Sequence, residues 1–340
     1  MNGNTPITLA YKLEHFEIFR FLVKNIDILN KKDANGNSIL YYTINECDVN
    51  NTKYLINNGI DVNFQDKFGN SALHISIYKK NREIINTLLQ NKNIILNTVN
   101  RRGESPLITI IKINDYKIKD NEDIIKELIK RGSGVNFVDN AGNSPLVYAV
   151  QKQSLPIVKL LIKKGANVNF ILRRSKKSIL MYAMELGGVD IVKHIVKSGA
   201  DINYKNDKGM SILKMAIEIN NNKDIFEYLI KYNVNNCYTG EICENEIIQR
   251  IIIKNRLDLI KILVNNNLDI NNPDDQGETA INYAVRNKSI DILKYLVANG
   301  ADVHNINNIG QSIEEINYIC NYDNNWNAYN KICNIIKSNK

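Results

Sequence analysis

Residues 139–169 read DNAGNSPLVYAVQKQSLPIVKLLIKKGANVN, and the fold can be inferred from this segment. It opens with a turn signal, Asp-x-x-Gly, followed by Ser144 and Pro145 at the start of an apolar run. Ser caps the first turn of a helix, and Pro is tolerated in that turn because no amide donor is needed there. A second apolar run, IVKLLI, places apolar side chains around most of a helix before Gly-Ala-Asn-Val-Asn ends the stretch. The pattern predicts a turn followed by two short helices.

The same phrase returns along the chain with a period close to 33 residues. Clear copies are DKFGNSALHIS from Asp66 and DQGETAINYA from Asp275. Ten positions hold the hairpin glycine or its equivalent: Gly3, Gly36, Gly69, Gly103, Gly142, Lys176, Gly209, Glu244, Gly277 and Gly310. Lys176 and Glu244 replace a residue that tolerates left-handed backbone, so we expect irregular turns at these two positions.

These motifs resemble the ankyrin repeat, in which a β-turn precedes Thr-Pro-Leu-His-x-Ala, a second helix follows, and Gly-Ala-Asp-x-Asn closes the unit. The resemblance covers nearly the whole chain and implies one domain, residues 1–340, that is an all-α solenoid of stacked helix-turn-helix units with β-hairpin loops, in a single elongated curved array. The implied units are approximately 1–32, 33–65, 66–99, 100–138, 139–172, 173–205, 206–240, 241–273, 274–306 and 307–340, the last being a C-terminal cap. His74 takes the family's histidine position, where the side chain holds neighbouring turns together by hydrogen bonds.

The spacing between the two helices of a unit supports this reading independently. The small residue of the first helix and the first apolar residue of the second differ by eight in most units, as in Ser76 to Ile84 and Ala149 to Ile157. The exceptions are Ala216 to Ile225, which is one residue longer, and Ile110 to Ile124, which is six longer because the segment KINDYKIKDNED, residues 112–123, is inserted. We expect this insertion to bulge from the turn between two helices and to be dispensable for folding.

The two ends are less regular. The sequence starts inside a repeat at Gly3, so the first unit is truncated or the sequence begins partway through a longer product. After Gly310 the sequence keeps a helical pattern but carries Glu314, Glu315 and Asn317 where apolar residues would meet a further neighbour. We therefore expect a C-terminal cap.

Composition narrows the class of protein. No apolar stretch approaches the roughly 20 residues that a membrane span needs, and the N-terminus lacks the pattern of a secretory signal. The five cysteines are scattered, which is typical of reduced thiols, and the one close pair, Cys237 and Cys243, lacks nearby histidines that would complete a zinc site. We expect a monomer in the cytoplasm, with the nucleus as the alternative compartment, and no bound metal.

No catalytic motif is present: the sequence lacks a Gly-x-Ser-x-Gly elbow, a phosphate-binding glycine loop, His-Glu-x-x-His and a dinucleotide fingerprint. We therefore predict a protein that is not an enzyme and needs no cofactor.

The candidate functional residues lie at the hairpin tips, because ankyrin-type proteins generally bind partners through these tips and the concave face of the first helices. The candidates are Lys67, Phe68, Arg101, Arg102, Arg174, Lys177 and Lys208. Two interpretations stay open for these basic residues: a solvated face, or a recognition patch for a protein with an acidic surface. Nucleic-acid binding is disfavoured because Phe68 alone supplies an aromatic ring at these tips.

The predicted function is that of a protein-interaction scaffold or adaptor. Two alternatives remain open at this point. The repeats could select substrates for a ubiquitin ligase or serve a pathogen effector, although the last 30 residues lack the Leu-Pro opening of an F-box. The chain could also be the ankyrin segment of a larger enzyme or channel.

Overall fold

The computed structural model describes residues 3–113, 121–219, 223–235, 244–320 and 326–338. The chain forms two compact units, Met1–Ile179 and Leu180–Lys340, which we call unit 1 and unit 2. Each consists of paired short helices, as the sequence predicts, and the β structure of the described residues is limited to isolated bridges such as that between Gln65 and Ser71. Within the described residues, no helix combines the length and the hydropathy needed to cross a bilayer.

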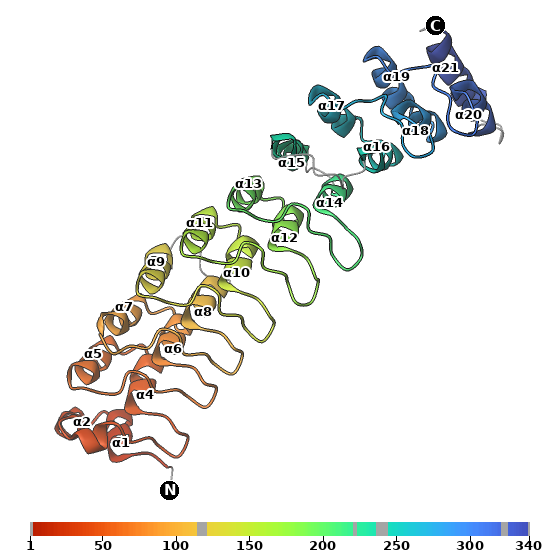
Figure 1. Cartoon of the computed structure of the whole chain (residues 1–340). Coiled ribbons are helices and arrows are strands. Elements are labelled where there is room, and N and C mark those ends of the chain that lie inside the picture. Colours follow the sequence, from red (N-terminus) through yellow and green to blue (C-terminus); the bar gives the residue numbers. More distant parts are fainter. Residues whose placement is uncertain (1–2, 114–120, 220–222, 236–243, 321–325, 339–340) are drawn as a thin grey trace. The chain divides into compact units, whose positions relative to one another are not determined.

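Unit 1 stacks its helices in two rows (Figure 1). The first helices of successive repeats are α1 (Pro6–Lys12), α4 (Ile39–Asn45), α6 (Ala72–Tyr78), α8 (Pro106–Lys112) and α10 (Pro145–Gln151). The second helices are α2 (Phe16–Val23) with the short α3 (Ile26–Leu29), α5 (Val49–Asn57), α7 (Arg82–Gln90), α9 (Glu122–Lys130) and α11 (Leu155–Lys163). Each first helix packs on its own second helix and on the first helix of the next repeat.

Unit 2 repeats this arrangement. Its first helices are α12 (Ile179–Glu185), which begins at the boundary residue, α14 (Ile212–Glu218), α16 (Glu244–Ile253), α18 (Ala280–Arg286) and α20 (Ile313–Cys320). Its second helices are α13 (Val189–Lys197), α15 (Lys223–Asn235), α17 (Leu257–Asn265), α19 (Ile290–Ala298) and α21 (Trp326–Lys337). The core of both units lies between the two rows, where residues such as Leu107 and Ile292 have no exposed area.

The helices begin where the sequence predicts. Thr5, Ser105 and Ser144 are the N-caps of α1, α8 and α10, and each side chain accepts a hydrogen bond from a backbone amide in the first turn. Proline occupies the first position of all three helices. The cap satisfies one of the amides that the helix leaves without a partner, so the turn residues also fix the register of the apolar face behind them.

An asparagine ladder ties the loops that follow the second helices. The side-chain amide of Asn97 donates to the carbonyl of Gly132 at 3.3 Å, and its oxygen accepts from the amide of Gly134 at 2.8 Å. Asn136 makes the same two bonds to the next repeat, with Gly165 and Asn167. The side chain of each asparagine therefore bonds to one carbonyl and one amide of the following loop.

The structure confirms one of three expectations about individual residues and contradicts the other two. The hairpin at Lys176 is irregular as expected, because it has one extra residue and Lys176 adopts a left-handed φ of 53°. The placement of Glu244 in a hairpin turn is wrong, since Glu244 is the first residue of α16; no glycine is available there, and acidic residues such as Glu246 suit a helix N-terminus. Asn317 was expected on the exposed face of the cap, but it is fully buried and donates to Cys333 Sγ at 3.4 Å.

The inserted segment lies between α8 and α9, at the turn that the spacing predicts. Residues 114–120 of it lie outside the described residues. Its ends belong to the fold, because Lys112 completes α8 and Glu122 begins α9. The expectation that all ten repeats form one continuous array stays a prediction.

Candidate protein-binding surface

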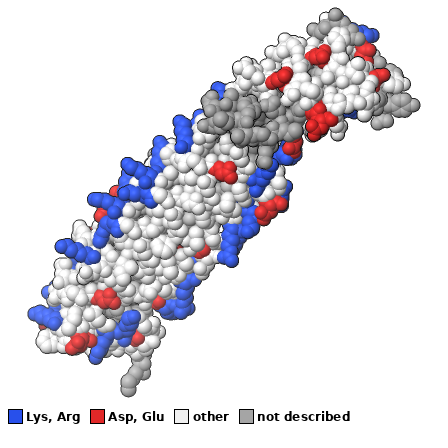
Figure 2. Space-filling model, in the orientation of Figure 1, with Lys and Arg blue, Asp and Glu red and all other residues white. Residues whose placement is uncertain are grey.

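The hairpins of unit 1 project to one side of the paired helices (Figure 1), and their tips carry the cations that the sequence singled out. We call residues 65–70, 99–104, 138–143 and 171–177 the hairpin edge. Lys67, Phe68, Arg101, Arg102 and Arg174 are exposed on it, and Lys177 is half-buried. Figure 2 shows Lys and Arg side chains along this side of the molecule.

Backbone hydrogen bonds join successive tips. The amide of Arg101 donates to the carbonyl of Phe68 at 2.9 Å, and the amide of Asn140 donates to the carbonyl of Arg102 at 2.9 Å. The side chain of Arg173 then packs directly over Gly142. A continuous chain of contacts therefore links four hairpins, so residues more than 100 positions apart in sequence lie along one edge.

The structure brings Lys67, Phe68, Arg101 and Arg102 together on this edge, and Arg174 and Lys177 lie two hairpins further along it, beyond the hairpin of Asn140. The Lys67 ammonium lies 5.2 Å from the centre of the Phe68 ring. Lys208 is exposed as well, but it belongs to a hairpin of unit 2.

The carboxylates of the hairpin edge turn inward instead. Asp66 Oδ1 accepts from the amides of Phe68 and Asn70 at 2.8 Å each. Asp139 Oδ1 accepts in the same way from Ala141 and Asn143, and Asp139 is only 5% exposed. Because these anions satisfy turn amides, they do not neutralise the exposed cations, and the outer side of the edge is positively charged.

Sequence reasoning missed a set of exposed apolar residues on the same edge. Val99, Val138 and Ile171 are 44%, 48% and 37% exposed, and each precedes the first residue of its hairpin turn. The equivalent residue in the preceding hairpin is Gln65, which is exposed too. Their position in the sequence could have revealed them, because all three directly precede a hairpin turn. This position is exposed in each of these repeats.

A polar network lies beneath the tips, at the ends of the first helices. Lys112 Nζ contacts Glu104 Oε1 at 2.6 Å and Asp139 Oδ2 at 3.6 Å, and it lies 5.2 Å from the centre of the Tyr148 ring. Burial alone would raise the pKa of Glu104, but the hydrogen bonds from Lys112 and Asn100 outweigh it and hold the pKa below its ordinary value. Burial would lower the pKa of Lys112, yet the hydrogen bond to Glu104 outweighs it and raises that pKa. The cluster consists of paired ions and offers no free acid or base.

His74 has the structural role that the resemblance implies. Its Nδ1 accepts from the amide of Ser71 at 3.1 Å, so Nε2 carries the proton and donates to the carbonyl of Glu104 in the next repeat at 2.8 Å. Burial lowers the pKa of His74. A neutral, fully buried histidine that joins two hairpins is a structural residue.

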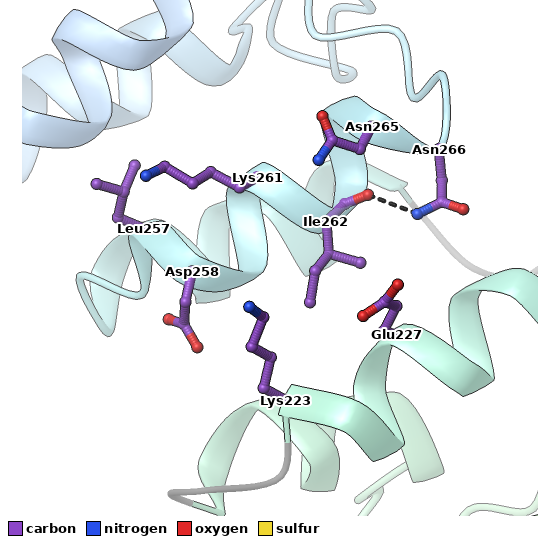
Figure 3. A pocket seen from close by; sticks show the side chains of 8 residues that line it. All are labelled: Lys223, Glu227, Leu257, Asp258, Lys261, Ile262, Asn265 and Asn266. Carbon is purple, nitrogen blue, oxygen red and sulfur yellow. Dashed lines mark hydrogen bonds between the residues drawn. The ribbon is translucent and has the colours of Figure 1, made fainter.

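A groove of about 510 Å³ lies between α15 and α17 of unit 2, on the side of the second helices (Figure 3). Lys223, Lys261, Glu227 and Asp258 line it. Glu227 pairs with Lys231 at 2.7 Å, and Asp258 pairs with Arg256 at 2.8 Å, so both carboxylates are engaged. The groove therefore presents no nucleophile with a neighbouring base.

In the part of the chain that the structure describes, no group of three or more His, Cys, Asp or Glu side chains is placed to hold a metal ion. The pair Cys237 and Cys243 lies outside those residues. The absence of a metal stays a prediction.

The stacked helix pairs, the hairpin edge and the His74 bond define the class of protein, and comparison with known families agrees. The family described as "Ankyrin repeats (3 copies)" matches residues 1–66, 46–118, 116–206, 180–245 and 213–307. The chain belongs to the ankyrin-repeat family.

Similar proteins include an enzyme and other proteins with ankyrin repeats. The chain is 30% identical over 141 residues to the phosphocholine transferase AnkX of Legionella pneumophila, which covers 41% of this chain and 14% of that protein. It is 29% identical over 151 residues to the ankyrin repeat protein YahD of Escherichia coli, covering 44% of this chain and 74% of YahD. The solved ankyrin repeat domain of Bcl-3 superposes with a TM-score of 0.52 and 25% identity over 63% of this chain and 95% of that chain.

Proposed function

We propose that this chain is a non-catalytic scaffold that holds a protein partner with an acidic surface along the hairpin edge of unit 1. Ankyrin repeats are generally protein-interaction modules, which supports the broad class. The partner's charge is inferred from the edge itself. We expect the protein to act as a monomer without a cofactor.

One observation carries the proposal: the hairpin edge separates its charges. Glu104 and Asp139 are 2% and 5% exposed and bind turn amides or Lys112, whereas Arg101, Arg102 and Arg174 are exposed. Paired surface ions contribute little to recognition, but unneutralised cations in a row attract an anionic partner and set its orientation.

The test is a charge reversal. The variant carries Arg101→Glu, Arg102→Glu, Arg174→Glu and Lys177→Glu, and partners are captured from a cell extract with immobilised protein and identified by mass spectrometry. We expect the wild-type chain to retain a partner that the variant loses. Capture by the wild type should also weaken as salt rises, because exposed charges are screened within about 8–10 Å at physiological ionic strength.

A matched control carries the same change in charge away from the edge, at Lys92, Lys130, Lys159 and Lys163. These lysines are exposed and lie on or beside the second helices. The control should capture the partner as the wild type does, with unchanged helicity in both variants. If the folded edge variant captures the partner equally well, the cations form a solvated face and do not bind the partner.

A second candidate function is substrate recognition on behalf of a larger protein. The match to the phosphocholine transferase favours it, because the matched segment spans only 14% of that protein's length. A ubiquitin-ligase adaptor, a pathogen effector or a channel could use the same surface in the same way. Sequencing the 5′ end of the native transcript would decide whether further coding sequence adjoins the repeats.

A further inference from the structure

The exposed apolar residues of the hairpin edge fall in one register. Val99, Val138 and Ile171 each lie two residues before a tip residue, namely Arg101, Asn140 and Arg173. The hairpin hydrogen bonds confirm the equivalence, because the following residue donates its amide across the turn in each case, from Asn100 to Glu104 at 3.0 Å and from Asp139 to Asn143 at 3.1 Å. Three consecutive repeats therefore present one apolar side chain each, and exposed arginines occupy the tips beside the first and the third of them.

We infer that this edge binds an extended peptide segment of the partner, in a polyproline II-like conformation, with an apolar residue at every third position and Asp or Glu between them. The inference rests on the proposed function and gives it a ligand class. Charge complementarity identifies the acidic residues, since Arg101, Arg102, Arg173 and Arg174 are exposed along the same stretch.

The repeat spacing sets the period of the segment. Helices that pack side by side lie about 8–10 Å apart, so the apolar stripe advances by about that distance for each repeat. Three residues of a polyproline II helix rise about 9 Å and complete one turn, which returns side chains i, i+3 and i+6 to the same face. A β-strand alternates its faces with a period of two, so it would turn every second apolar residue of such a series away from the stripe.

The edge is preorganised for such a ligand. The tips are joined by the Phe68–Arg101 and Arg102–Asn140 backbone bonds, both 2.9 Å long, and Asn140 Nδ2 also donates to the carbonyl of Arg101 at 2.9 Å. A surface that is ordered before binding loses little conformational entropy when a ligand docks. Acidic residues of the segment would lie beside the tips, and its apolar residues would cover the valines and the isoleucine.

The experiment is a selection of random twelve-residue phage-displayed peptides on the immobilised full-length chain. Three variants are compared with the wild type by titration of the selected peptides: an apolar variant with Val99→Ser, Val138→Ser and Ile171→Ser; the charge-reversed variant described above; and a control with Ile26→Ser, Ile95→Ser and Ile253→Ser. The control residues are 54%, 54% and 56% exposed and none of them precedes a hairpin turn, so the control removes the same kind of surface elsewhere.

We expect selected peptides to carry large apolar residues three positions apart, with Asp or Glu between them. Their affinity should fall by about tenfold or more in the apolar variant, because buried apolar area is lost, and should be unchanged in the control. A selection that yields no binders, peptides without the period of three, or equal binding to the apolar variant would overturn the inference. If only the charge-reversed variant weakens binding, the inference fails while the proposed function stands; if neither variant weakens binding, both fail.

Discussion

Lys112 Nζ lies 2.6 Å from Glu104 Oε1, and this pair connects three successive repeats of unit 1. Glu104 Oε2 accepts from Tyr78 of the preceding repeat at 3.0 Å, while Lys112 reaches Asp139 and Tyr148 of the following one. Unit 2 contains a related pair, in which Arg286 donates to both oxygens of Glu278. Nearest-neighbour interfaces largely determine the stability of a repeat array, so a pair that spans two interfaces should affect it measurably.

Replacement of Glu104 by Gln should destabilise the protein by about 1–2 kcal/mol, since it removes the anion that Lys112, Asn100 and Tyr78 share while Lys112 stays partly solvated. The measurement is the urea midpoint of unfolding followed by circular dichroism. The control, Glu17→Gln, makes the same chemical change at an exposed site on α2 and should alter stability by less than about 0.5 kcal/mol. Equal effects of the two substitutions would contradict a structural role for the pair.

The same carboxylates should make stability depend on acid. The pKa values of Glu104 and Glu278 are held below their ordinary value in the folded chain, so the unfolded chain binds more protons and stability falls as pH falls. The stabilisation is present above pH about 4.3 and disappears as pH falls through the lower folded-state value. The double variant Glu104→Gln/Glu278→Gln should therefore lose less stability between neutral and acidic pH. Parallel curves of urea midpoint against pH would refute this origin of the acid sensitivity.

Asn282 offers a site for stabilisation, because it occupies in α18 the place of His74 in α6. Its Oδ1 accepts from the Thr279 amide at 3.1 Å, but its buried Nδ2 has no partner. We expect Asn282→His to donate from Nε2 to the carbonyl of Gln311, as His74 does to Glu104, and to raise the unfolding free energy by about 1 kcal/mol at pH 8.

The reverse substitution, His74→Asn, is the matched control and should lower stability by a similar amount. Burial lowers the pKa of His74, so the gain from a neutral histidine is present above pH about 6.5 and is lost as pH falls further. A loss of stability in Asn282→His at pH 8 would show that the larger ring does not fit between the two hairpins.

We expect that the insertion between α8 and α9 can be removed if the residues that belong to these two helices are kept. Residues 113–121 connect these helices, whereas residues 79–81 suffice between α6 and α7. Deletion of residues 114–119 restores the shorter length and should change the melting temperature by less than about 2 °C, since loop length affects stability weakly. A deletion of equal length over residues 112–117 removes Lys112 and should lower the melting temperature clearly. Loss of cooperative unfolding in the first deletion would show that the segment packs on the array.

The sequence was sufficient for the repeat, the caps and the histidine bond, because each depends on neighbours at fixed sequence offsets. Ser105 and Pro106 define the start of α8 wherever the helix packs, and His74 needs only the next hairpin. Burial is different, since it depends on what lies opposite a residue. Asn317 stood in an expected exposed position, yet it is fully buried and bonds to Cys333.

The candidate surface was also predictable in part, namely where it depends on local turn signals. Turn signals placed Arg101 and Arg102 at a tip, where solvent is the default neighbour. Val99 and Ile171 carry no such signal, because β-branched side chains beside a turn are also typical of buried strands. Lys112 was assigned to the insertion, since the end of α8 follows from packing and not from the local motif.

Bonds such as that between Asn97 and Gly134, 37 residues apart, also bear on how the protein is made. The loops after the second helices of unit 1, and hairpins such as that of Phe68, bond to the next repeat along the chain. A nascent chain leaving the ribosome can therefore close one repeat interface soon after the following repeat emerges, and it need not wait for the C-terminus. Unit 1 is thus suited to vectorial folding during synthesis, with no more than one repeat's interface left open at the growing end.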